Sequence, residues 1–170
     1  MTFEWRLVVA LPILAALITG CGEFGADTPR AGWERSMNAY AERDYGGLWD
    51  SLADASRQDT IRVLTHVKRD PRYRESMRRK FQIAPAVLDT MTPREFFVAL
   101  MAAVERTAPQ AIALRAESAR TARFSREIIK GDRATVYFDS EKGGPEKMTF
   151  ALEADRWRPI LERPVAAPGR

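Results

Sequence analysis

Cysteine and histidine are almost absent from this sequence, since each occurs once among 170 residues. The lone cysteine, Cys21, excludes an intramolecular disulfide and any metal site built from several cysteines. The chain also lacks the Gly-x-Ser-x-Gly, Ser-x-x-Lys, His-Glu-x-x-His and phosphate-loop patterns of common hydrolases, zinc proteases and nucleotide-binding enzymes. We therefore assign no catalytic residue, no metal ligand and no cofactor from the sequence.

The sequence also has no hydrophobic run long enough for a confident membrane span, which needs about 20 apolar residues. Its longest apolar stretch is the twelve residues from Leu7 to Ile18, interrupted only by Pro12 and preceded by Arg6. A basic start followed by a short apolar segment is typical of an export signal. We expect residues 1–20 to be a signal peptide.

The residues that follow this apolar run are Ile18-Thr19-Gly20-Cys21, which resemble the bacterial lipobox. The resemblance implies that Cys21 is diacylated and becomes the first residue of the mature chain, with palmitate-type acyl groups on the membrane side. An ordinary secretory signal with an incidental cysteine and an uncleaved anchor helix are the alternatives. Gly22 stands where lipoproteins retained in the inner membrane favour Asp, so the expected location is the bacterial cell envelope, lipid-anchored in the outer membrane and facing the periplasm.

The remaining composition fits one folded domain, with 45% hydrophobic and 29% charged residues. The net charge of +4 is too small to indicate nucleic-acid binding. Gly25, Pro29 and Gly32 lie in a segment with few apolar side chains. We expect a flexible tether over 21–32, a single domain over 33–163 and a disordered tail over 164–170.

Helical periodicity dominates the first half of the expected domain, beginning with Trp33, Met37 and Tyr40. The clearest start signal is Thr92-Pro93-Arg94-Glu95, a capping box with proline at the first helical position, which predicts a helix over 93–106. The pattern does not identify an element between Pro109 and Ala122.

From residue 124 the apolar period changes to two, as in half-buried strands. Ala134, Val136 and Phe138 alternate with polar neighbours, and Gly131-Asp132 and Asp155-Arg156 mark hairpin turns. The expected fold class is therefore α+β, with N-terminal helices packed on a curved C-terminal antiparallel sheet of about four strands.

Two phrases, Tyr40–Trp49 and Gly131–Val136 with the following Phe150–Trp157, resemble the nuclear transport factor 2-like superfamily, which includes ketosteroid isomerase-like domains. The resemblance implies a cone-shaped domain with a cavity between sheet and helices. Members use that cavity for catalysis by an Asp, His or Tyr, or only for binding.

Few residues are candidates for such chemistry. His66 lies near the end of a predicted helix, where a structural role is expected, and Tyr137 and Asp139 are predicted to point to solvent. Asp50 and Asp54 are spaced by one helical turn, which is typical of solvated acids on a polar face.

The most unusual feature is the stretch 68–80, which contains seven basic and two acidic residues. Its net charge of +5 exceeds the net charge of +4 of the whole chain. It predicts contact with an anionic lipid surface or an acidic envelope partner, and a solvated arginine-rich helix face is the alternative. The residues expected to make the contact are Lys68, Arg69, Arg72, Arg74, Arg78, Arg79 and Lys80.

Taken together, these patterns predict a lipid-anchored envelope protein whose domain is a non-catalytic small-molecule-binding or protein-interaction module. The alternatives are a ketosteroid isomerase-like enzyme that transfers protons or adds water, and a surface scaffold that acts through the basic stretch.

Overall fold

The computed structural model describes residues 25–141 and 144–161, in which helices are followed by strands. The helices are α1 (Pro29–Glu42), α2 (Tyr45–Ser51), α3 (Asp54–Arg69), α4 (Pro71–Phe81), α5 (Pro85–Thr90), α6 (Pro93–Thr107) and α7 (Pro109–Thr121). The strands are β1 (Arg123–Lys130), β2 (Arg133–Ser140), β3 (Gly144–Glu153) and β4 (Arg156–Ile160). This order confirms the α+β class.

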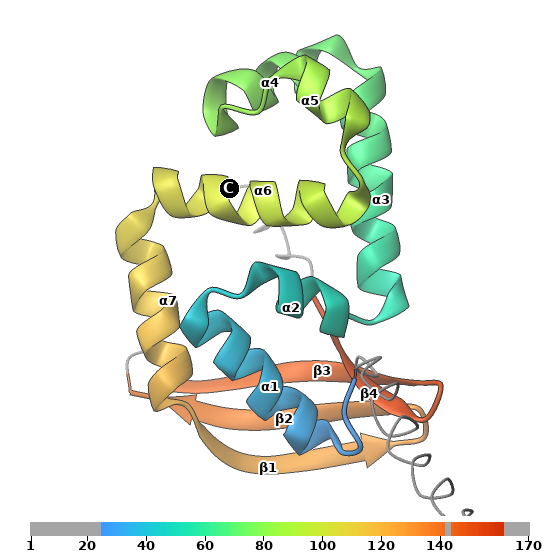
Figure 1. Ribbon diagram of the computed structural model, residues 1–170. Coiled ribbons are helices and arrows are strands. Elements are labelled where there is room, and N and C mark those ends of the chain that lie inside the picture. Colours follow the sequence, from blue (N-terminus) through green and yellow to red (C-terminus); the bar gives the residue numbers. More distant parts are fainter. Residues whose placement is uncertain (1–24, 142–143, 162–170) are drawn as a thin grey trace, which may run out of the picture.

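The strands form one antiparallel sheet in the order β1-β2-β3-β4, so each strand pairs with its neighbour in sequence. Gly131 adopts a φ of 60° in the turn between β1 and β2, a left-handed conformation that glycine takes without steric cost. The predicted meander is therefore confirmed. All the helices lie on one side of this sheet (Figure 1).

Helices α1 and α7 are nearest the sheet, whereas α4 and α5 lie at the far end of the molecule (Figure 1). Helix α3 connects the two levels, because the backbone N–H of Asp54 at its start donates to the side-chain carboxylate of Glu153 on β3 and its other end leads into α4. The helices thus form a stack above the sheet, and none of the helices in the described part of the chain lies on its other face (Figure 1).

Three groups of buried side chains follow this stack. The first lies between α1 and the sheet and contains Trp33, Met37, Ala134, Val136, Phe138, Phe150 and Trp157. The second joins α2 to α6 through Tyr45, Leu48, Trp49, Leu52 and Phe97. The third joins α3 and the α4–α5 region to α6 through Leu64, Val67, Ile83, Leu88 and Phe96.

The predicted capping box is confirmed at the start of α6. The backbone N–H of Glu95 donates to the Thr92 hydroxyl at 3.2 Å, and the Glu95 carboxylate accepts from the Thr92 backbone N–H at 2.8 Å. The bond from the Thr92 backbone N–H, followed by one from the Thr92 hydroxyl to the same carboxylate, lowers the pKa of Glu95. The helix runs one residue beyond the predicted end.

The predicted tether is wrong over its described part, residues 25–32. Ala26 is buried and forms a bridge with Trp157, and α1 begins at Pro29 with Thr28 as its N-cap. Apolar periodicity could not reveal this start, because Gly32 packs against the core without an apolar side chain. A Cβ at this position would lie 3.0 Å from the Phe150 ring. The signal peptide, Cys21 and the tail 164–170 lie outside the described residues.

Candidate functional site

The best-formed hollow among the described residues is a cavity of about 320 Å³ bounded by α1, α7 and the sheet. Its size is at the lower end of the range that small-molecule sites occupy. Its lining consists of Met37, Tyr40, Arg115, Ser118, Ala119, Phe138, Glu146, Lys147, Met148, Thr149, Ile160 and Leu161.

The helical wall of this cavity comes from two packed helices. Met37 and Tyr40 are three residues apart on α1, and Arg115, Ser118 and Ala119 are spaced by three and four residues on α7. Side chains at these spacings lie on one face of a helix. Each helix therefore directs one short row of side chains at the cavity.

The sheet wall is open at one edge because β4 is shorter than β3. The last pair of this ladder is Thr149 with Ile160, so the first half of β3, residues 144–148, has no β4 partner. Phe138 and Met148 contribute apolar surface from β2 and β3. Glu146, Lys147 and Met148 of this unpaired part of β3 line the cavity.

Tyr40 and Arg115 provide polar chemistry on the helical wall. Burial raises the pKa of the Tyr40 phenol, and the nearby positive charge of Arg115 opposes this rise. The phenol is therefore a neutral hydrogen-bond donor at physiological pH, beside an arginine that is always charged. Opposite them, Glu146 accepts a hydrogen bond from the Ser140 hydroxyl at 2.8 Å.

This arrangement can hold a small molecule with two unlike parts. Met37, Phe138 and Met148 offer apolar contact, while Tyr40 and Arg115 offer donors to an oxygen or an anionic group. Among the described lining residues, neither His66 nor a pair of aspartates is present.

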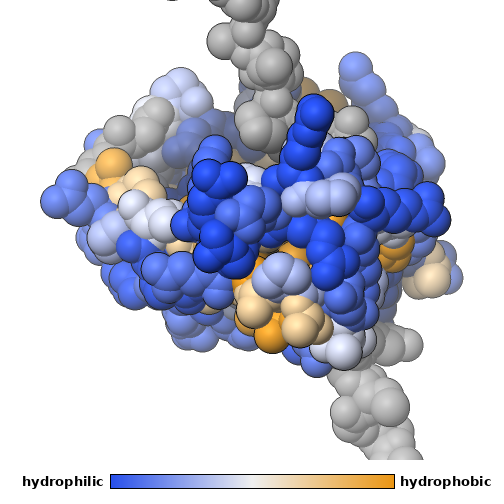
Figure 2. Space-filling view, turned by 90° about the horizontal axis from the view of Figure 1, so that it is seen from above, coloured by the Kyte–Doolittle hydropathy of each residue, from blue (hydrophilic) through white to orange (hydrophobic). Residues whose placement is uncertain are grey.

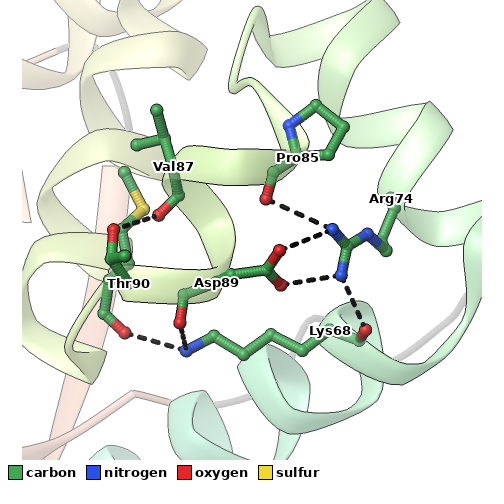
Figure 3. Close-up of polar contacts among 7 residues, drawn as sticks. Lys68, Arg74, Pro85, Val87, Asp89 and Thr90 are labelled. Carbon is green, nitrogen blue, oxygen red and sulfur yellow. Dashed lines mark hydrogen bonds and ion pairs between the residues drawn. The ribbon is translucent and has the colours of Figure 1, made fainter.

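The basic residues of the stretch 68–80, predicted as a contact surface, fall into two groups in the structure. Some bind neighbouring segments of the fold, and the others are exposed. Arg74 donates through both terminal nitrogens to the Asp89 carboxylate, at 2.7 and 2.8 Å, and also to the Lys68 and Pro85 carbonyl oxygens (Figure 3). The bidentate contact lowers the pKa of Asp89.

Lys68 has a similar internal role. Its ammonium donates to the backbone oxygens of Asp89 and Met91, at 3.2 and 3.0 Å, which ties the end of α3 to α5 and the segment after it (Figure 3). Lys68 and Arg74 thus hold the α3–α4–α5 corner together, and we no longer count them as surface contacts.

The other basic residues of the stretch are more exposed. Arg78 and Arg79 both pair with Glu75, at 2.6 and 2.9 Å, and lower the pKa of that carboxyl, Arg78 having the larger effect. Arg69, Arg72 and Lys80 are exposed and make no ion pair with a described residue. The surface seen from above, toward α4 and α5, is mainly hydrophilic (Figure 2).

The remaining candidates lie apart from the cavity. His66 is exposed near the end of α3, with its ring 4.6 Å from that of Tyr73. Tyr137 and Asp139 lie on the helix-free face of the sheet, because they alternate with the buried Val136 and Phe138. This agrees with the predicted orientation.

The expectation that Asp50 and Asp54 share one helical turn is wrong. Helix α2 ends at Ser51 and α3 starts at Asp54, with Leu52 and Ala53 extended between them and fully buried. Asp50 instead pairs with Arg94 at 2.9 Å, joining α2 to α6. The two buried residues between the helices cause the break, which spacing alone did not reveal.

Sequence reasoning missed Tyr40 and Arg115 as polar residues of the cavity's helical wall. Tyr40 appeared only as an apolar position of the first helix, and Arg115 lies in the segment without a predicted element. Helix α7 has apolar and polar residues mixed around its axis, so its periodicity is weak. The only available signal was Pro109, which opens α7 at its first turn.

No group of three or more His, Cys, Asp or Glu side chains able to hold a metal ion occurs in residues 25–141 and 144–161. In the same part of the chain, no single helix is long and apolar enough to cross a membrane, although α6 and α7, bent by 110° at their junction, reach that length and composition together.

Comparisons of the chain with protein-family models, with curated proteins and with solved structures found no match.

Proposed function

We propose that this protein is a lipid-anchored module of the bacterial envelope that binds a small amphipathic molecule in the cavity between α1, α7 and the sheet. The anchor is supported by the Ile18–Cys21 motif, and the binding role by the cavity. A cavity beneath helices on a curved sheet is also what the resemblance to nuclear transport factor 2-like domains implies.

The binding role is supported by the combination of side chains that line the cavity. A partly buried neutral phenol, Tyr40, and an exposed cation, Arg115, line the same cavity beside apolar side chains. The ligand class that fits has an apolar body and an anionic or strongly accepting end. Arg115 attracts the charged end, Tyr40 donates to it, and Met37 and Phe138 contact the body.

Naphthalene-1-sulfonate is a suitable probe because it combines an apolar body with one anionic group. Its binding is measured by saturation-transfer NMR on the full-length protein in lipid nanodiscs, with empty nanodiscs as the blank. We expect binding to the wild type and about tenfold or more weaker binding to Arg115→Gln, since a hydrogen bond to a charged group contributes about 1.5–3 kcal/mol.

Two further variants make the test specific to the cavity. Ser118→Phe places a ring in the cavity and is expected to abolish binding. Arg72→Gln removes the same charge from exposed α4 and is expected to bind like the wild type. If the folded wild type did not bind, or if Arg115→Gln and Arg72→Gln bound equally, the proposal would be overturned.

A further inference from the structure

Among the described residues, the helix-free face of the sheet is contacted by helices only at its β4 end, where Glu153 accepts from the Asp54 backbone N–H and Arg158 donates to the Asp50 backbone oxygen. Its side chains follow from the register, because the core residues Ala134, Val136 and Phe138 point to the helices and the alternate residues point away. Directly paired residues share a face, so the partners of Arg133, Thr135, Tyr137 and Asp139 lie there too.

This face is strongly basic. Its acidic residues are Asp139 and Glu153. Its basic residues are Arg123, Arg126, Lys130 and Arg133 on β1 and β2, Lys147 on β3, and Arg156 and Arg158 on β4.

The cations differ in their availability. On β4, Arg156 pairs with Asp27, and Arg158 is half-buried beside Glu153 and donates to the backbone oxygen of Asp50 in α2, so neither is available to a membrane. On β1 and β2, Lys130 and Arg133 are exposed opposite each other, and Arg126 lies 4.7 Å over the Tyr137 ring. The β1–β2 side of the face therefore presents cations and an aromatic ring, a combination that suits a lipid headgroup layer.

The chain enters the fold at the rim of this same face. Gly25 lies against β4 so closely that an added Cβ would meet the Arg156 side chain at 2.6 Å, and Ala26 pairs with Trp157. Gly25 is four positions after Cys21, and an extended chain of four Cα-to-Cα steps spans at most about 14 Å. A lipid on Cys21 therefore holds the β4 rim close to the membrane.

The basic helix α4 does not share this position. It lies at the other end of the molecule, beyond α3 (Figure 1). Sixteen residues of α3 rise about 24 Å from Asp54, which contacts Glu153 on the sheet. That rise exceeds both the reach of the chain from Cys21 to Gly25 and the Debye length of about 8 Å at physiological salt.

From this geometry we infer that the helix-free face of the sheet, and not the basic helix α4, docks on the anionic phospholipid surface of the membrane that holds the anchor. The inference rests on the lipid anchor of the proposed function. Docking of this face leaves the helix stack, including α4, directed away from the membrane (Figure 1).

The test uses the full-length protein isolated with its anchor and reconstituted into vesicles. Cys21 is the only cysteine, so a thiol-reactive dye reports a single introduced cysteine once Cys21 is acylated. The two label positions are Ile128→Cys on the helix-free face and Val87→Cys on α5 at the far end, which are 38% and 46% exposed. Quenching by nitroxide-headgroup lipid is measured in phosphatidylcholine vesicles with and without phosphatidylglycerol.

We expect the label at residue 128 to be quenched when phosphatidylglycerol is present, and the label at residue 87 to remain unquenched. Reversing two cations of the face in Lys130→Glu/Arg133→Glu should abolish the quenching. The matched reversal on α4, Arg72→Glu/Lys80→Glu, should leave it unchanged.

Two kinds of failure are distinguishable. If the protein floats with the vesicles but the label at residue 128 stays unquenched, or the label at residue 87 is quenched instead, the docking inference is wrong and the anchor stands. If the dye reacts with the unsubstituted chain and the protein does not float, Cys21 is unmodified and the proposed anchor itself is wrong.

Discussion

Tyr40 illustrates how the surroundings of one side chain decide its chemistry. It occupies an ordinary apolar position of α1, and in the fold it reaches the cavity, where burial raises its pKa and Arg115 partly opposes the rise. The same residue type at position 73 is 48% exposed on α4. Residue type alone therefore does not distinguish a ligand donor from a surface ring.

A consequence of the raised Tyr40 pKa is a loss of stability at alkaline pH. Above pH 10, the ordinary value for tyrosine, the unfolded chain releases the phenol proton while folded Tyr40 retains it. The free energy of unfolding should therefore fall as the pH rises from about 10 toward the folded-state pKa. In Tyr40→Phe this fall should be shallower, as measured by denaturant unfolding at a series of pH values. Equal alkaline slopes in the two proteins would contradict the assignment.

At the scale of elements, α6 and α4 show two ways of stabilising a helix. Helix α6 begins with its capping box and places Phe96 and Phe97 in two different core groups. Helix α4 has no fully buried residue: Met77 and Phe81 pack only partly buried against the third core group, and its ion pairs join Arg74 to Asp89 and Arg78 and Arg79 to Glu75. Because exposed ion pairs are weak, α4 should be the more easily opened of the two.

The cap of α6 should therefore contribute measurably to stability. Replacing Thr92 by Ala removes the oxygen that accepts from the Glu95 backbone N–H, which should cost about 1 kcal/mol of unfolding free energy. Thr92→Ser retains the hydroxyl and serves as the matched control. Chemical denaturation measures both variants, and an unchanged midpoint for Thr92→Ala would show that the cap is dispensable.

At the scale of the whole molecule, the sheet organises the positions of the cavity and of the chain entry. Phe150 of β3 is fully buried among Trp33 and the β2 side chains, and it packs against Gly32 of α1. This contact determines how closely α1 packs on the sheet, and therefore where Tyr40 lies in the cavity wall.

Phe150→Ala should destabilise the protein by about 3–5 kcal/mol, because a large buried ring is replaced by a void. Leu152→Ala, two residues along the same strand and 37% exposed, should cost less than about 1 kcal/mol. Thermal and denaturant unfolding provide the comparison. Similar losses in both variants would mean that the core does not centre on this face of β3.

The sequence by itself determined the features that depend on near neighbours in the chain. The α6 cap, the alternation of Ala134, Val136 and Phe138 and the hairpin turns identified an α+β chain ending in an antiparallel meander. Each of these depends on hydrogen bonds or faces set within a few residues, so a local pattern records it.

Only the tertiary structure decided the features that depend on distant contacts. Whether Arg74 is a surface charge depends on Asp89, whether Gly32 belongs to a tether depends on Phe150, and the cavity exists only where α7 meets α1 above β3. Burial and charge pairing depend on which segments come into contact in the fold. A single sequence contains both partners of each contact but does not show that they are in contact.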